Sequence, residues 1–106
     1  MASVYYRPAA RRDLIDHFVY LATNADEATA DRFIASTEAS FAALAEEPQM
    51  GSPLTPRSPE LAGLRKWRVS GFDNFLIFYL PRKNGVSIVR VLHAARDWWE
   101  LLGIGH

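Results

Sequence analysis

The sequence of 106 residues predicts an α+β fold, in which an antiparallel helical hairpin packs on a curved antiparallel β-sheet. Two observations lead to this prediction. Apolar residues recur at helical spacing through the first half of the chain. After Gly63 they recur with the period of two that is typical of strands. The predicted element order is strand, helix, helix, strand, strand, strand, in a single domain over residues 1–106.

A short strand at residues 3–6 comes first. Pro8 then suits the first turn of a helix, because its missing N–H is not needed there. Asn24, followed three residues later by Glu27, has the pattern of a capping pair that opens a second helix. Two amphipathic helices joined by a tight turn form an antiparallel hairpin.

Pro48 ends the second helix, and residues 48–63 follow without a usable period. This stretch holds four of the six prolines of the chain, so we expect an irregular connection rather than a helix or a strand. Connections of this length are often functional or mobile.

Three strands are predicted after this connection, over residues 64–70, 74–81 and 85–93. The first alternates between its two faces, and the middle strand is apolar on both. The pair Asn84-Gly85 predicts a tight hairpin between the last two, because both residues tolerate positive φ. The three strands form an antiparallel meander that the N-terminal strand can extend.

The helical hairpin can cover only one face of this sheet, so something else must cover the second. Strict alternation divides the last strand into two faces, with Val89 and Val91 on one and Val86, Ile88, Arg90 and Leu92 on the other. Arg90 then lies among apolar side chains, where an unpaired charge is unfavourable. Two explanations stay open, which are an ion pair with Asp97 and a binding role for Arg90.

Composition excludes several classes of function. The absence of cysteine excludes disulfides and thiolate sites, and His17, His93 and His106 lie too far apart for a local zinc motif. No phosphate-binding loop, dinucleotide fingerprint or nucleophile elbow is present. We therefore expect no metal and no cofactor. Asp13 and Asp16 are interpreted as solvated charges of the first helix.

No apolar run approaches the roughly 18 residues of a membrane span, and the N-terminal stretch lacks the pattern of a signal peptide. We expect a cytoplasmic protein without a membrane partner. The net charge is zero, but residues 1–47 hold four basic and eight acidic residues, whereas residues 57–96 hold eight basic and two acidic ones. Ten of the twelve basic residues are arginine, which suits bidentate contacts with carboxylate or phosphate. The C-terminal half is therefore expected to contact an acidic partner, unless its charges form only a solvated surface.

The stretches "GLRKWRVSGFDNFLIFY" and "VSIVRVLHAARD", after a short strand and a helical hairpin, resemble the RelE/ParE superfamily of toxins from bacterial type II toxin–antitoxin systems. The similarity is strongest to the ParE branch and runs from "YYRPAARRDL" to Asp97. It implies a toxin that a cognate ParD-like antitoxin, commonly with a ribbon-helix-helix DNA-binding domain, neutralises in a hetero-oligomer. The complex would bind operator DNA through the antitoxin, which would also cover the second sheet face.

The resemblance implies one of two activities. RelE-like toxins cleave mRNA on the ribosome, which requires a base, an acid and cationic stabilisation. This chain has Lys66, Arg68 and Arg96 at matching positions, but it lacks the arginine of the third strand and the C-terminal tyrosine. ParE-like toxins instead bind and poison DNA gyrase, which needs no catalytic set. We predict a gyrase inhibitor without catalytic residues, and the alternative is a ribosome-dependent endoribonuclease in which His93 is the acid or base.

The candidate antitoxin- or target-binding residues all lie in the C-terminal half. They are Arg65, Lys66, Arg68, Arg90, His93, Arg96 and Asp97. Arg90 and Arg96 are expected at the groove that the antitoxin covers, and His93 and Asp97 are expected to hold that strand end in place. Trp98 and Trp99 are interpreted as packing groups that close the sheet.

Overall fold

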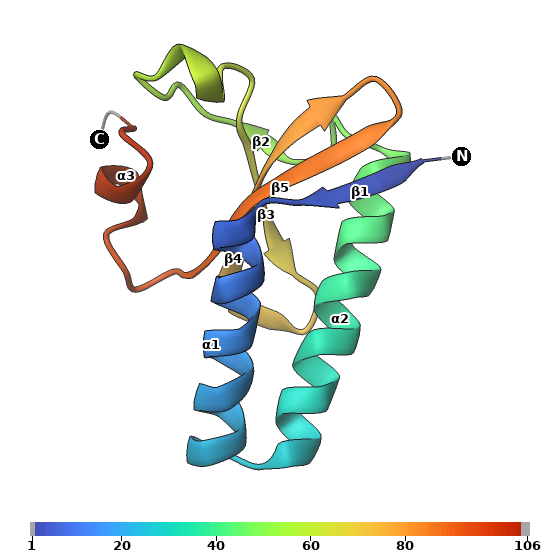
Figure 1. The fold of residues 1–106 in the computed structure, drawn as a ribbon, viewed down its shortest axis with the longest axis vertical. Helices are drawn as coiled ribbons and strands as arrows, with labels where there is room; N and C mark the ends of the chain where they lie inside the picture. The colour runs from blue at the N-terminus through green and yellow to red at the C-terminus, as the bar shows by residue number, and fades with distance from the viewer. Residues whose placement is uncertain (1, 105–106) are drawn as a thin grey trace.

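In the computed structural model, which describes residues 2–104, two helices lie side by side against a twisted sheet (Figure 1). The elements in chain order are β1 (Ser3–Tyr6), α1 (Pro8–Asn24), α2 (Glu27–Glu46), β2 (Ser52–Pro53), the 3₁₀ helix η1 (Pro59–Leu61), β3 (Arg65–Val69), β4 (Phe72–Arg82), β5 (Gly85–His93) and α3 (Trp98–Leu101). The predicted α+β class and the order of its six main elements are confirmed. His106 lies outside the described residues.

The sheet has the strand order β1-β5-β4-β3-β2. β3, β4 and β5 form the predicted antiparallel meander, but β1 pairs with β5 in parallel, so the sheet is mixed. The parallel pairing brings β1 very close to the start of β5. A Cβ atom added to Gly85 would lie 1.8 Å from the carbonyl oxygen of Ser3, so this approach requires glycine.

The turn between the helices differs from its prediction. Asn24 belongs to the last turn of α1, where its Nδ2 donates a hydrogen bond to the carbonyl of Tyr20. The residue that caps α2 is Asp26, whose Oδ1 accepts a hydrogen bond from the backbone N–H of Thr29 at 2.6 Å. The predicted Asn24–Glu27 capping pair is therefore wrong. The hydrogen bond from Thr29 lowers the pKa of Asp26, because it stabilises the carboxylate.

The connection between α2 and β3 is more ordered than predicted, since it contains β2 and η1. Tyr79 of β4 holds its first part in place. The Tyr79 hydroxyl donates to the carbonyl of Pro48 at 2.7 Å and accepts from the N–H of Gly51 at 2.8 Å. Burial of this tyrosine raises its pKa. The start of the connection is thereby joined to the middle of the sheet.

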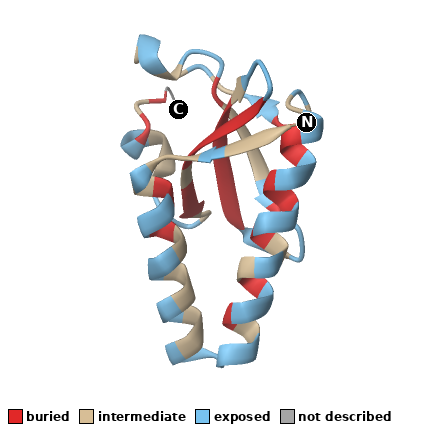
Figure 2. Ribbon diagram, turned by 45° about the vertical axis from the view of Figure 1, so that its right-hand side comes forward, coloured by how far each residue is buried: buried red, intermediate tan, exposed pale blue. Residues whose placement is uncertain are grey.

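The sheet carries an apolar cluster on each face, and most residues of β4 and β5 are buried (Figure 2). As predicted, β4 contributes to both faces, with Phe75, Ile77 and Tyr79 against the helices and Leu76, Phe78 and Leu80 on the other side. The residues that cover this second side come from the connection and the C-terminal segment. They are Leu54, Leu61, Leu64, Trp98, Trp99, Leu102 and Ile104. The chain itself thus supplies most of the cover for which we expected a partner, and both tryptophans pack as predicted.

A β-bulge in β5 overturns the faces predicted for this strand. Tyr79 pairs with Ile88, but its neighbour Phe78 pairs with Arg90, which leaves Val89 as an extra residue. Because of this extra residue, Ile88 and Val91 both belong to the cluster on the helix side. Strict alternation, which placed Arg90 among the side chains of Val86 and Ile88, is therefore wrong.

Candidate functional site

Arg90 forms an ion pair with Asp13 of α1 and not with Asp97. Its Nε donates to Oδ2 of Asp13 at 2.7 Å, and its Nη2 donates to Oδ1 at 2.9 Å. These hydrogen bonds raise the pKa of Arg90. Asp13 is buried, with 6% of its surface exposed, so its interpretation as a solvated charge is also wrong. The charge in the apolar strand is balanced within the chain.

Side chains of α1 also complete the edge of β5 beyond the end of β1. The N–H of Arg7 donates to the carbonyl of Ile88 at 3.0 Å, where β1 ends. Farther along, Asp13 accepts from the N–H of Val91 at 2.9 Å, and Nε2 of His17 donates to its carbonyl at 2.7 Å. Neither side chain was predicted from the sequence to contact β5. Asp13 and His17 are four residues apart, so they lie on the same face of α1. This spacing is the feature of the sequence from which their joint contact with the sheet could have been predicted.

Arg65 contacts the connection rather than an open surface. Its Nη1 donates to the carbonyls of Gly51 and Gln49, and its Nη2 donates to Oε1 of Gln49 at 2.5 Å. Three hydrogen bonds of this guanidinium group therefore stay within the chain. Arg65 joins the connection to β3, next to the anchor that Tyr79 provides.

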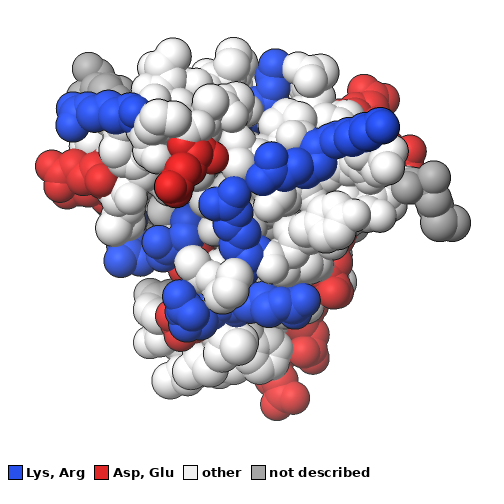
Figure 3. Space-filling model, turned by 45° about the horizontal axis from the view of Figure 1, so that its top comes forward, with Lys and Arg blue, Asp and Glu red and all other residues white. Residues whose placement is uncertain are grey.

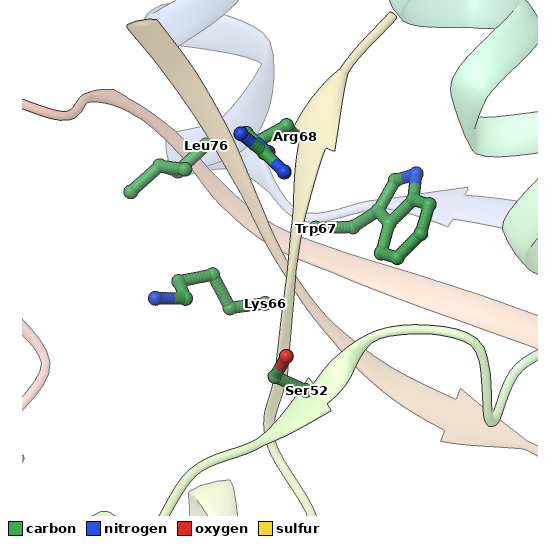
Figure 4. A pocket seen from close by; sticks show the side chains of 5 residues that line it. All are labelled: Ser52, Lys66, Trp67, Arg68 and Leu76. Atoms are coloured by element: carbon green, nitrogen blue, oxygen red, sulfur yellow. The ribbon is translucent and has the colours of Figure 1, made fainter. Parts of the chain in front are cut away.

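Lys66 and Arg68 point to the same side of β3, as the predicted alternation requires, and Trp67 points to the other (Figure 4). The Nζ atom of Lys66 lies 4.9 Å from the centre of the Trp98 ring, a cation–π contact. Arg68 is exposed beside a hollow of about 310 Å³, which Ser52, Lys66, Trp67, Arg68 and Leu76 line. Of the two cations on this side of β3, Lys66 packs on the C-terminal segment and Arg68 is open to solvent.

The other candidate residues lie where β5 ends. The ring of His93 packs edge-on against Phe75, with 5.2 Å between the centroids, and its Nδ1 accepts from the N–H of Ala95 at 3.1 Å. The side chains of Arg96 and Asp97 are exposed and line one shallow hollow. The candidates thus form separate groups on β3 and after β5, with Arg90 held by α1.

The face in Figure 3 shows Lys and Arg side chains across its middle, with Asp and Glu mainly toward its edges. Within residues 2–104, Arg90–Asp13 is the only ion pair, so no other basic side chain there is in direct contact with a carboxylate. In the same part of the chain, no group of three His, Asp or Glu residues could hold a metal ion. No helix described here is long and apolar enough to span a bilayer.

The family of the chain follows from its match to known proteins. The profile described as "ParE toxin of type II toxin-antitoxin system, parDE" matches residues 4–98. The chain belongs to the ParE toxin family. The fold is similar to that of a solved structure titled "Chromosomal ParDE TA system from P. aeruginosa", with a TM-score of 0.69 and 15% identity, over 88% of this chain and 96% of the other. Comparison with curated protein sequences gives no match.

The resemblance to the ParE branch is therefore confirmed, and the architecture is that of a ParE toxin. One surface of this ParE-family toxin corrects the helical pattern of the sequence. That pattern adds Ile15 and Val19 to the buried apolar face of α1 with Leu14 and Phe18, and this prediction is wrong. Ile15 and Val19 on α1 are 62% and 56% exposed, although they are spaced as one apolar strip. Ile15 also borders a hollow between the helices, which is lined by Tyr6, Arg11, Leu14, Ile15 and Glu38. Ile15 and Val19 are one helical turn apart, so their exposed side chains adjoin each other on the surface of α1.

Proposed function

We propose that this protein inhibits bacterial growth by binding and poisoning DNA gyrase in the cytoplasm, and that a ParD-like ribbon-helix-helix antitoxin neutralises it. The observation that carries the proposal is the ParE-family match over residues 4–98. Operator DNA is then contacted through the antitoxin. The activity is one of binding, so it requires no catalytic residue.

The local structure of β4 supports gyrase over the ribosome as the target. RNA cleavage needs an acid, a base and cationic stabilisation, and the resemblance to RelE-like toxins implies an arginine in this strand as one of the cations. The middle of β4, from Phe75 to Leu80, is instead apolar and buried in the two clusters. His93, the one candidate acid or base, is engaged by Phe75 and by the N–H of Ala95.

For the antitoxin, we place the contact on the apolar strip of Ile15 and Val19. The second sheet face is largely covered by the chain itself, whereas this strip and the hollow beside it are open. An amphipathic antitoxin helix can lay its apolar side on such a strip. Ile15→Ser combined with Val19→Ser should then weaken antitoxin binding at least tenfold and leave gyrase inhibition intact. The exposed Tyr20→Ser, on the same helix, is the matched control.

For the target, we propose the exposed cations Arg68 and Arg96, with Lys66 beside them. Arg68 and Arg96 have no carboxylate partner among residues 2–104 and are open to an acidic surface. Arg65 and Arg90 are held by hydrogen bonds inside the chain, so we assign them to positioning. We assign His93 to holding the strand end, because its carbonyl accepts a hydrogen bond from the N–H of Arg96 at 3.0 Å. The side chain of Asp97 is exposed and caps no helix, so the support expected from it does not come from a cap hydrogen bond.

The decisive experiment is a gyrase supercoiling assay with purified toxin, scored for cleaved-complex accumulation, with and without the protein encoded by the adjacent reading frame. Arg68→Gln with Arg96→Gln is compared with Arg32→Gln, an exposed arginine on α2. Inhibition that the neighbouring protein relieves, and that the double variant loses, supports the proposal. A folded, growth-inhibiting toxin without effect on gyrase would overturn it and direct the search to mRNA cleavage on ribosomes, with His93→Gln first.

A further inference from the structure

One corner of the second sheet face is left open by the segments that cover the rest of it. The strand register pairs Tyr5 of β1 with Ser87 of β5, and Ser87 with Leu80 of β4, so these three side chains share one face. Leu80 belongs to the cluster opposite the helices. Tyr5 therefore points away from the helical hairpin, and 56% of its surface is exposed.

This corner forms a hollow of about 420 Å³ at the turn between β4 and β5. The residues that line it are Tyr5, Arg82, Lys83, Asn84 and Ser87. None of them is acidic, and neither cation has an ion-pair partner among residues 2–104. The turn is held against β1, because the N–H of Ser3 donates to the carbonyl of Asn84 at 2.7 Å. The hollow is therefore built on the sheet rather than on a loose loop.

The two consecutive tyrosines of β1 have opposite surroundings. The ring of Tyr6 packs edge-on against Phe41 at 5.4 Å, and the guanidinium of Arg11 lies 4.7 Å from its centre. The ring of Tyr5 makes no aromatic or cation–π contact with any described residue. An aromatic ring exposed on a sheet face can stack on an unpaired base. Nearby cations and hydrogen-bond donors suit the adjoining phosphate.

We propose that this corner binds a single strand of nucleic acid. A base stacks on Tyr5, the phosphate next to it lies between Arg82 and Lys83, and the side chains of Asn84 and Ser87 donate hydrogen bonds. A polyanion fits better than a protein partner, because the hollow offers one aromatic ring and two cations without a carboxylate. This activity needs neither gyrase binding nor RNA cleavage, so it goes beyond the function proposed above.

The test is the fluorescence anisotropy of a labelled oligothymidylate of about twelve nucleotides, titrated with the whole protein at about 50 mM salt. We expect Tyr5→Leu to weaken binding by about 5- to 150-fold, the range that loss of one stacked base produces. Arg82→Gln with Lys83→Gln should reduce the slope of log K against log salt by about 0.7, because the two cations together neutralise one phosphate. Tyr20→Leu is the matched control, because Tyr20 is 60% exposed on α1.

Three results would overturn the proposal: no binding at this salt concentration, equal binding by the Tyr5→Leu and Tyr20→Leu variants, and a duplex that binds as tightly without any need for Tyr5. An oligouridylate of the same length separates the two sources of such a strand, since the tighter ligand identifies DNA or RNA. The supercoiling assay on Tyr5→Leu distinguishes failure of the nucleic-acid proposal from failure of the gyrase proposal. Retained gyrase inhibition with lost oligonucleotide binding shows that the corner acts independently of gyrase.

Discussion

The carboxylate oxygen Oδ2 of Asp13 accepts a hydrogen bond from Nε of Arg90 at 2.7 Å and another from the N–H of Val91 at 2.9 Å. Asp13 of α1 therefore neutralises the charge of Arg90 on β5. It also accepts a hydrogen bond from the N–H of Val91, which β1 cannot reach because its pairing with β5 ends at Ile88. Both contacts occur next to the bulge at Val89. The pair joins the helical hairpin to β5, the strand that carries the candidate residues Arg90 and His93 and leads into Arg96 and Asp97.

Removal of this carboxylate should be strongly destabilising. We expect Asp13→Ala to lower the free energy of unfolding by about 3–5 kcal/mol, because it leaves Arg90 without a counter-charge and the N–H of Val91 without an acceptor. Urea denaturation measures this loss. The exposed Asp16→Ala on the same helix should change stability by less than about 0.5 kcal/mol. Equal effects of the two variants would contradict the buried role of Asp13.

Variants of Asp13 and Arg90 can distinguish a structural role of Arg90 from a binding role. Arg90→Met should lower stability, and the double variant with Asp13→Ala should show a coupling energy above about 1 kcal/mol in a double-mutant cycle. Gyrase inhibition and antitoxin affinity, measured on the folded fraction, should stay unchanged. A loss of either activity without a loss of stability would restore Arg90 to the contact surface.

The hydroxyl of Tyr79 should contribute measurably to stability. Tyr79→Phe removes the donor to Pro48 and leaves the buried N–H of Gly51 unpaired, so we expect a loss of about 1–3 kcal/mol in urea denaturation. Burial raises the pKa of Tyr79 above its ordinary value of 10.0. Its contribution is therefore complete below pH 10 and falls as the pH rises through the higher value of the folded state. The Phe variant should lack that alkaline decline.

Glycine at position 85 should be required for the docking of β1. A Cβ atom there would lie 1.8 Å from the carbonyl oxygen of Ser3, so Gly85→Ala should separate β1 from β5 and cost at least about 1 kcal/mol. Hydrogen exchange of the β1 and β5 amides would report this separation. Gly71 has a φ of +78° with open space around it, so Gly71→Ala tests the backbone effect alone. Similar exchange in both variants would rule out the steric explanation.

Asp26 should stabilise α2 in a pH-dependent way. Because the hydrogen bonds from Thr29 lower its pKa in the folded state, its contribution is complete above the ordinary value of 3.8 and is lost as the pH falls through the lower folded value. The difference in thermal stability between the native chain and Asp26→Ala should therefore be largest near neutral pH and shrink below pH 3.8. A difference that is independent of pH would show that the carboxylate charge plays no part in the cap.

The local pattern of apolar and polar residues was sufficient to predict most of the helices and strands. The helical spacing before Pro48 and the alternation after Gly63 predicted both helices and all three strands of the meander within a few residues. The two-sided apolar pattern of β4 predicted that the sheet has two covered faces, which the structure confirms. The motifs that resemble ParE toxins led to the family that the profile match confirms.

The candidate site was harder to predict, because its contacts join distant parts of the chain. Arg90 and Asp13 are separated by 77 positions, so neither residue marks the other in the sequence. A bulge at Val89 shifts every following side chain to the opposite face, and no residue type announces it. The cover of the second sheet face by the C-terminal segment likewise follows from packing and not from periodicity.

The elements and their order could be predicted without the structure, since helical and strand periods are local consequences of which side chains must leave water. The quoted motifs were likewise enough to predict the family. Which charges are free could be learned only from the folded protein. Arg65 and Arg90 are held inside the chain, whereas Arg68, Arg82 and Lys83 face solvent. The reason is physical, because a charge is paired or free according to the register and packing of strands that meet only in the folded protein.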